Sequence, residues 1–136
     1  MTSARPTLND FVVRSTRAVL DVVSVPGALE IPLALQTLAL ERRGFAGRRY
    51  DALVALGCVV RGETTHYDYI CAESARGLMD LSIREGYAIG YGILTVENIT
   101  QAQVRAALDQ GDKGGEAMRA CVAMIALKRS LNEAAR

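Results

Sequence analysis

Residues 52–74 read Ala52-Leu-Val-Ala-Leu-Gly-Cys-Val-Val-Arg-Gly-Glu-Thr-Thr-His-Tyr-Asp-Tyr-Ile-Cys-Ala-Glu-Ser74. The run over 52–60 is apolar apart from its one glycine, which predicts a buried strand of a parallel sheet. A short polar loop follows, and apolar residues then recur at helical spacing, which predicts an amphipathic helix over 65–85. A strand, a tight loop and a helix in this order favour an α/β fold.

The loop between this strand and this helix has the composition of an anion-binding turn. Gly62 allows a ligand to approach the backbone closely, and the helix that follows offers free N–H groups. Thr65 and Asp68 have the spacing of a capping box, with Asp in place of the usual Glu. His66 is the only histidine; a lone histidine is often a cap or core residue, but its place at a strand-to-helix junction favours proton transfer.

The remaining sequence predicts further elements around this unit. We expect strands over 22–25, 51–60 and 87–96, and helices over 10–20, 28–44, 65–85, 98–109 and 116–132. The last of these helices is expected to bury Met118, Cys121, Val122 and Ile125. This order predicts a parallel sheet with helices on both faces. Three strands make a narrow sheet, so either another strand exists or a neighbouring subunit covers the edge.

Length, charge and cysteine content restrict the class of protein. The chain has 136 residues, a net charge of +1 and 50% apolar residues, which predicts one domain over 1–136 with a sizeable core. Balanced charges predict no nucleic-acid partner, and no apolar run is long enough for a membrane span or a signal peptide. Cys58, Cys71 and Cys121 are expected to be buried, reduced thiols of a cytoplasmic protein, and no spacing indicates a metal site.

Four further residues have both a structural and a functional interpretation. Arg105 and Lys113 are either solvated surface cations or a phosphate clamp, if they converge on the loop at Gly62. Glu30 near a helix start is either a carboxylate favoured by the helix dipole or an acceptor for substrate hydroxyls. Tyr91 stands between two glycines and either packs in the core or stacks on a planar ligand.

Several stretches together resemble the 6,7-dimethyl-8-ribityllumazine synthase family. They are Val25-Pro-Gly-Ala-Leu-Glu-Ile-Pro32, Ala55-Leu-Gly-Cys-Val-Val-Arg-Gly-Glu-Thr-Thr-His-Tyr-Asp-Tyr69, Gly92-Ile-Leu-Thr-Val-Glu-Asn98 and Gly111-Asp-Lys-Gly-Gly115. The resemblance is clear over about 21–136, and four motifs in the right order make it specific.

The resemblance implies an enzyme of riboflavin biosynthesis. The family condenses 5-amino-6-(D-ribitylamino)uracil with 3,4-dihydroxy-2-butanone 4-phosphate to give 6,7-dimethyl-8-ribityllumazine, phosphate and water. It needs no cofactor or metal. The small-molecule partners expected from the resemblance are therefore these two substrates.

The resemblance also implies a role for each residue that matches a family motif. His66 corresponds to the proton-transfer histidine. The residues expected at the butanone phosphate are Glu63, Thr64, Arg105 and Lys113. The residues expected at the ribitylaminouracil are Ala28, Leu29, Glu30, Cys58, Val59, Val60 and Tyr91, the last across a subunit boundary.

The implied fold is a three-layer αβα sandwich with a flavodoxin-like parallel sheet, assembled as pentamers or as larger assemblies of pentamers. A typical member begins with an apolar strand that ends in an Arg-aromatic pair, whereas this sequence has Ala4-Arg5-Pro6. The first edge strand is therefore expected to be missing or shortened. This departure leaves two alternatives to the active enzyme: a non-catalytic, self-assembling scaffold that binds flavin or pteridine, and a different flavodoxin-like binder of phosphate esters.

Overall fold

The computed structural model describes residues 20–41 and 50–135. The elements in chain order are a 3₁₀ turn η1 (Ala28–Glu30), α2 (Ile31–Leu40), β1 (Ala52–Val60), α3 (His66–Glu85), β2 (Ala88–Val96), α4 (Ile99–Ala106) and α5 (Lys113–Ala134). Strands β1 and β2 pair in parallel from Ala52 opposite Ala88 to Val60 opposite Val96. Helix α3 connects them, so this part of the chain is a βαβ unit.

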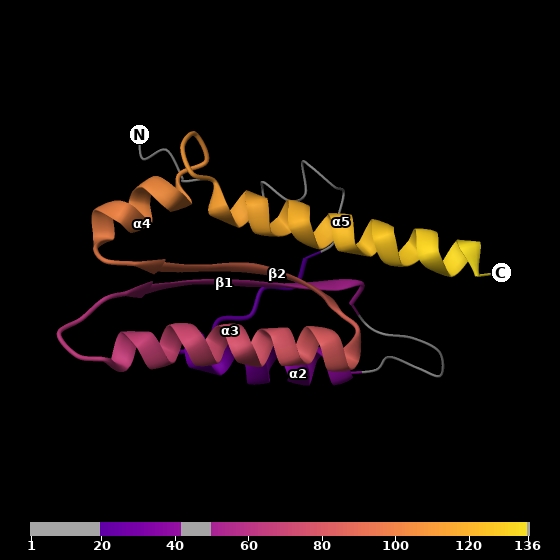
Figure 1. Ribbon diagram of the computed structural model, residues 1–136, viewed down its shortest axis with the longest axis horizontal. Helices are drawn as coiled ribbons and strands as arrows, with labels where there is room; N and C mark the ends of the chain where they lie inside the picture. Colours follow the sequence, from indigo (N-terminus) through magenta and orange to yellow (C-terminus); the bar gives the residue numbers. More distant parts are fainter. Residues whose placement is uncertain (1–19, 42–49, 136) are drawn as a thin grey trace.

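The helices lie in two layers, one on each face of the strands. Figure 1 shows α2 and α3 below β1 and β2, with α4 and α5 above them. The structure is therefore the expected α/β, three-layer arrangement with a parallel sheet. Within the described residues that sheet has two strands, so it is narrower than the sequence predicts.

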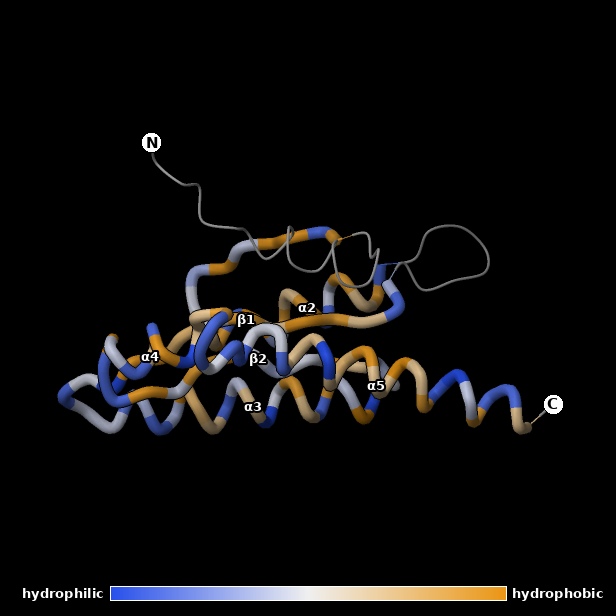
Figure 2. The backbone as a smooth tube through the Cα atoms, turned by 90° about the horizontal axis from the view of Figure 1, so that it is seen from above, coloured by the Kyte–Doolittle hydropathy of each residue, from blue (hydrophilic) through white to orange (hydrophobic). Residues whose placement is uncertain are grey.

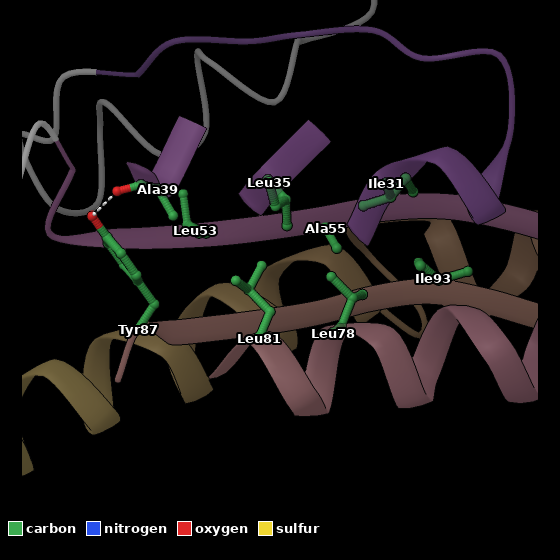
Figure 3. Packing of buried hydrophobic residues seen from close by; sticks show 9 residues of the cluster. All are labelled: Ile31, Leu35, Ala39, Leu53, Ala55, Leu78, Leu81, Tyr87 and Ile93. Carbon is green, nitrogen blue, oxygen red and sulfur yellow. Dashed lines mark hydrogen bonds between the residues drawn. The ribbon is translucent and has the colours of Figure 1, made fainter. Parts of the chain in front are cut away.

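The main core lies between the sheet and the α2–α3 layer. Figure 3 shows the side chains that form it: Ile31, Leu35, Ala39, Leu53, Ala55, Leu78, Leu81, Tyr87 and Ile93. Leu78 is only 2% exposed and Leu81 only 6%, and burying one such side chain stabilises the fold by roughly 1.5–3 kcal/mol. The hydroxyl of buried Tyr87 donates a hydrogen bond of 3.1 Å to the carbonyl of Ala39 and ties β2 to the end of α2.

On the opposite face of the sheet, β2 presents Gly90 and Gly92 to α5, and these glycines let the helix approach closely. A Cβ added at Gly90 would lie 2.5 Å from the carbonyl oxygen of Ala117 on α5. Cys121 is fully buried there, with its sulfur 3.4 Å from the carbonyl oxygens of Leu53 and Ala88. Val122, predicted for the same buried face, is instead 38% exposed.

The strand predicted over 22–25 is wrong. These residues have no regular secondary structure, and Val22 and Val23 are 62% and 56% exposed. Figure 2 shows this segment running apart from β1. Its β-branched composition favours a strand, but a strand also needs a neighbour for its N–H and C=O groups, and the described chain supplies none there.

Several helix boundaries also differ from the predictions. Helix α2 ends at Leu40 instead of near 44, and most of the helix predicted over 10–20 lies outside the described residues. Helix α4 ends at Ala106, before the predicted 109, because the chain turns back there. Helix α5 begins at Lys113 instead of 116, because the Asp112 side chain caps it by accepting from the N–H of Gly115. No helix in the described ranges is long and apolar enough to cross a membrane.

Candidate active site

The candidate site lies at the carboxyl edge of the parallel strands. The N–H of Arg61 donates to the carbonyl of Val96 across 2.9 Å, so the loops after β1 and β2 leave the sheet side by side. Figure 1 shows α3 starting at this end on one face and α4 lying at the same end on the other. In open α/β sheets, this edge is where ligands bind.

The loop over 61–65 presents unused backbone donors. Among the described residues, none accepts a hydrogen bond from the N–H groups of Gly62, Glu63 or Thr64. A Cβ added at Gly62 would meet nothing within 4 Å, so the space above the loop is open. Consecutive free N–H groups that lead into a helix N-terminus can hold a phosphate.

The capping box expected at the start of α3 is wrong. Thr65 already has helical backbone angles and its side chain makes no capping bond. The hydroxyl of Thr64 instead accepts from the N–H of His66, at 3.3 Å. The Asp68 carboxylate turns toward Arg61, 3.4 Å from its Nη2. The helix start is thus held by Thr64 and by an ion pair.

His66 is the first residue of α3 and its side chain is exposed beside this loop. Within the described chain its ring has no hydrogen-bond partner. An imidazole that is open to solvent next to an anion-binding loop can exchange protons with a bound ligand. The structure therefore brings His66 together with Glu63 and Thr64.

Arg105 and Lys113 lie at the two ends of one compact turn. The N–H of Gly111 donates to the carbonyl of Val104 at 2.9 Å, which returns the chain onto the last turn of α4. Arg105 donates through Nη1 to the carbonyl of Gln101 at 3.1 Å. Lys113 pairs through Nζ with Glu116 at 2.5 Å. Neither cation contacts the loop over 61–66 by a hydrogen bond or ion pair in the described structure.

The turn that contains Ala28, Leu29 and Glu30 lies beside β1. A Cβ added at Gly57 would lie 3.6 Å from the side chain of Ile31, so the start of α2, directly after η1, reaches the carboxyl half of the strand. Ala28 packs partly buried against the core, whereas Leu29 is 43% exposed and Glu30 is exposed. Residues 28–30 and 58–60 thereby lie in one region of the fold.

Tyr91 is not part of that region within one chain. It precedes Val96, the last residue of β2, by five positions, which corresponds to about 16 Å along the strand. Tyr91 pairs with Ala55, so these two side chains lie on the same face of the sheet. Side chains alternate between faces along a strand, and Cys58 is three residues after Ala55, so Cys58 lies on the opposite face. Tyr91 is 41% exposed, which contradicts simple core packing. Cys58 is also exposed, so the expectation that all three thiols are buried is wrong.

Arg61 is a residue that sequence reasoning did not single out. Its Nε lies 2.8 Å from Glu97 and its guanidinium carbon lies 4.2 Å above the centre of the Tyr67 ring. The hydrogen bond to Glu97, more than the weaker contribution of Asp68, raises the pKa of Arg61. Partial burial raises the pKa of Tyr67. The only signal in the sequence for this ion pair is the carboxylate of Glu97, directly after β2.

Fold and site define an α/β protein with free backbone N–H groups and an exposed histidine at the carboxyl edge of a parallel sheet, within the described residues. Residues 2–129 match the family model of 6,7-dimethyl-8-ribityllumazine synthase. The chain belongs to this 6,7-dimethyl-8-ribityllumazine synthase family.

Similar proteins agree with that membership. The chain is 54% identical over 111 residues to 6,7-dimethyl-8-ribityllumazine synthase of Afipia carboxidovorans, which covers 82% of this chain and 68% of the relative. It is 55% identical over 114 residues to 6,7-dimethyl-8-ribityllumazine synthase 1 of Rhizobium meliloti, covering 84% and 74%. It is 50% identical over 121 residues to the enzyme of the same name from Agrobacterium fabrum, covering 89% and 81%.

Proposed function

We propose that this chain is a lumazine synthase of riboflavin biosynthesis. It condenses 5-amino-6-(D-ribitylamino)uracil with 3,4-dihydroxy-2-butanone 4-phosphate to 6,7-dimethyl-8-ribityllumazine, phosphate and water. Family membership supports the reaction. The observation that carries the site assignment is the set of N–H groups over 62–64 that have no partner among the described residues, with the exposed His66 two residues further on.

The chemistry requires positioning and proton transfer. The aromatic amine adds to the ketone, water leaves to form an imine, and phosphate is eliminated before the ring closes. Holding two substrates in the right geometry supplies much of the acceleration. His66 moves protons between the amine and the departing oxygen atoms. The Glu63 and Thr64 N–H groups hold the phosphate and stabilise it as it leaves.

The uracil side of the site is assigned to the region beside the end of β1. The backbone of Cys58, Val59 and Val60 is proposed to hold the pyrimidine edge. The turn at Ala28, Leu29 and Glu30 is proposed to contact the ribityl chain. Its support is the packing of Ile31, directly after η1, beside Gly57 in β1, together with the exposure of Glu30.

We also propose that the active unit is a homo-oligomer, built from pentamers. Arg105, Lys113 and Tyr91 do not contact the loop of their own chain, which favours their contribution to a neighbouring site. Apolar side chains are exposed on the α4–α5 side, as in a subunit contact: Val104, Leu108, Val122, Met124, Leu127 and Leu131. We further propose one domain over 1–136 and a cytoplasmic location, which the three free thiols favour.

A spectroscopic assay with both substrates tests the function. We expect product absorbance and fluorescence to appear well above the rate of the spontaneous reaction. Binding of the uracil substrate without any product would instead support the non-catalytic scaffold. Absence of uracil binding would support a different phosphate-ester binder.

A further inference from the structure

Arg61 connects three elements at the point where the candidate phosphate loop begins. Its N–H extends the strand ladder to Val96, and its Nε pairs with Glu97 just beyond β2 at 2.8 Å. Its Nη2 lies 3.4 Å from Asp68 in the first turn of α3. The same guanidinium covers the face of the Tyr67 ring. The Arg61 side chain thus connects the start of the loop to the end of β2 and to the first turn of α3.

We propose that Arg61 is a positioning residue, which holds the loop over 62–65 in the conformation that aims its N–H groups at the substrate phosphate. This inference rests on the proposed function, since it concerns the same loop. Arg61 acts through the loop, and no step of the reaction is assigned to its guanidinium.

The surroundings of Arg61 favour a local role over a role in overall stability. Its side chain is 39% exposed, and the carboxylates of Asp68 and Glu97 are 58% and 56% exposed. Ion pairs this open to water contribute little to the free energy of unfolding. The loop itself has few internal bonds, so restricting its conformations before the ligand binds improves binding of the ligand.

The geometry needs arginine and not simply a positive charge. Two nitrogens of the fork reach two carboxylates on different elements while the flat group lies on an aromatic ring. A lysine ammonium keeps the charge but cannot make this arrangement. Arg61→Lys should therefore keep only part of the phosphate affinity that Arg61→Gln loses.

Arg76 provides a matched control on the same helix. It pairs with Glu73 at 2.5 Å and with Asp80 at 3.1 Å, so it too joins two carboxylates. Both partners belong to α3, however, so Arg76 connects no separate elements and lies away from the loop. Arg76→Gln removes an ion-pair network of the same size without touching the candidate site.

The experiment compares wild type with Arg61→Gln, Arg61→Lys, Glu97→Gln and Arg76→Gln. For each protein, the initial rate is measured while the concentration of one substrate is varied and the other substrate is saturating. We expect Arg61→Gln to raise the KM for the butanone phosphate about tenfold, which corresponds to the net contribution of roughly one hydrogen bond to the phosphate. The KM for the uracil should change less than about twofold. Arg61→Lys and Glu97→Gln should fall between, and Arg76→Gln should match wild type.

A second readout uses hydrogen exchange and inorganic phosphate on the full chain. Amides over 62–66 should exchange faster in Arg61→Gln, and phosphate affinity should fall, while Arg76→Gln keeps both. An unchanged KM and unchanged exchange in Arg61→Gln, or equal increases in both KM values, would overturn the inference. If wild type forms no product, the proposed function fails, and the exchange and phosphate affinity still decide the role of Arg61.

Discussion

Gly111 lies directly against Arg105. A Cβ added at Gly111 would lie 2.6 Å from the Cα of Arg105 and 2.9 Å from its carbonyl oxygen. The N–H of Gly111 also bonds to the carbonyl of Val104. This close approach connects the turn before Lys113 to the helix that carries Arg105, so the two candidate phosphate cations are held in one unit.

Replacing Gly111 by Ala is expected to push this turn away from α4. The methyl group would meet backbone atoms, which cannot move aside as a flexible side chain does. We expect a loss of roughly 1–3 kcal/mol in the free energy of unfolding, measured by urea denaturation, with a raised KM for the phosphate substrate. Gly62→Ala is the control for stability, since its Cβ meets nothing within 4 Å; it should change the unfolding free energy by less than about 0.5 kcal/mol. Equal stability of the two variants would contradict the prediction.

Replacing His66 by Ala should slow turnover without abolishing it. Positioning of both substrates survives, because the His66 side chain bonds to no other described residue. We expect a decrease in kcat on the order of 10²-fold, at the lower end of what a general acid–base group contributes. An unchanged kcat would remove His66 from the mechanism.

Mixed assemblies test whether sites are shared between subunits. His66→Ala and Arg105→Ala chains are each expected to be weakly active alone. When they are unfolded and refolded together, some interfaces combine an intact His66 with the neighbour's intact Arg105, as a ring of head-to-tail contacts allows. Activity should exceed the sum of the separately refolded variants. Activity equal to that sum would place both residues in one chain's site.

The three thiols should differ in reactivity with an alkylating reagent. Cys58 is exposed and should react first, Cys71 is partly covered, and Cys121 is fully buried and should react only on unfolding. Mass spectrometry of the native protein after limited labelling checks this order. Early labelling of Cys121 would mean that α5 separates readily from the sheet.

The buried thiol of Cys121 is expected to make the stability of the fold depend on pH. Burial raises the pKa of Cys121 above its ordinary value of 9.0. Above pH 9.0, the unfolded state releases this proton while the folded state keeps it. The contribution of the buried Cys121 thiol to the free energy of unfolding is therefore complete below pH 9.0 and is lost as the pH rises above it. The difference in unfolding free energy between wild type and Cys121→Ala should shrink above that pH. A constant difference would contradict the assignment.

The sequence alone determined the central strand and the helix that follows it. Apolar residues over 52–60 and the helical spacing that follows predict β1 and α3, and Asn98 caps α4 as its position indicates, by accepting from Gln101 at 2.9 Å. These features depend on residues a few positions apart, whose periodicity and capping act locally. The four motifs also predicted the family, to which the chain belongs.

Only the tertiary structure decided which distant groups meet. Val22–Val25 has the composition of a strand but no described neighbour to pair with, and the Arg61 side chain turns to Glu97 across the sheet edge. Gly111 packs the turn before Lys113 against Arg105, while Tyr91 lies five residues before the end of β2. Pairing of strands, ion pairs between elements and close backbone contacts depend on residues that folding brings together, and spacing along the chain does not encode them.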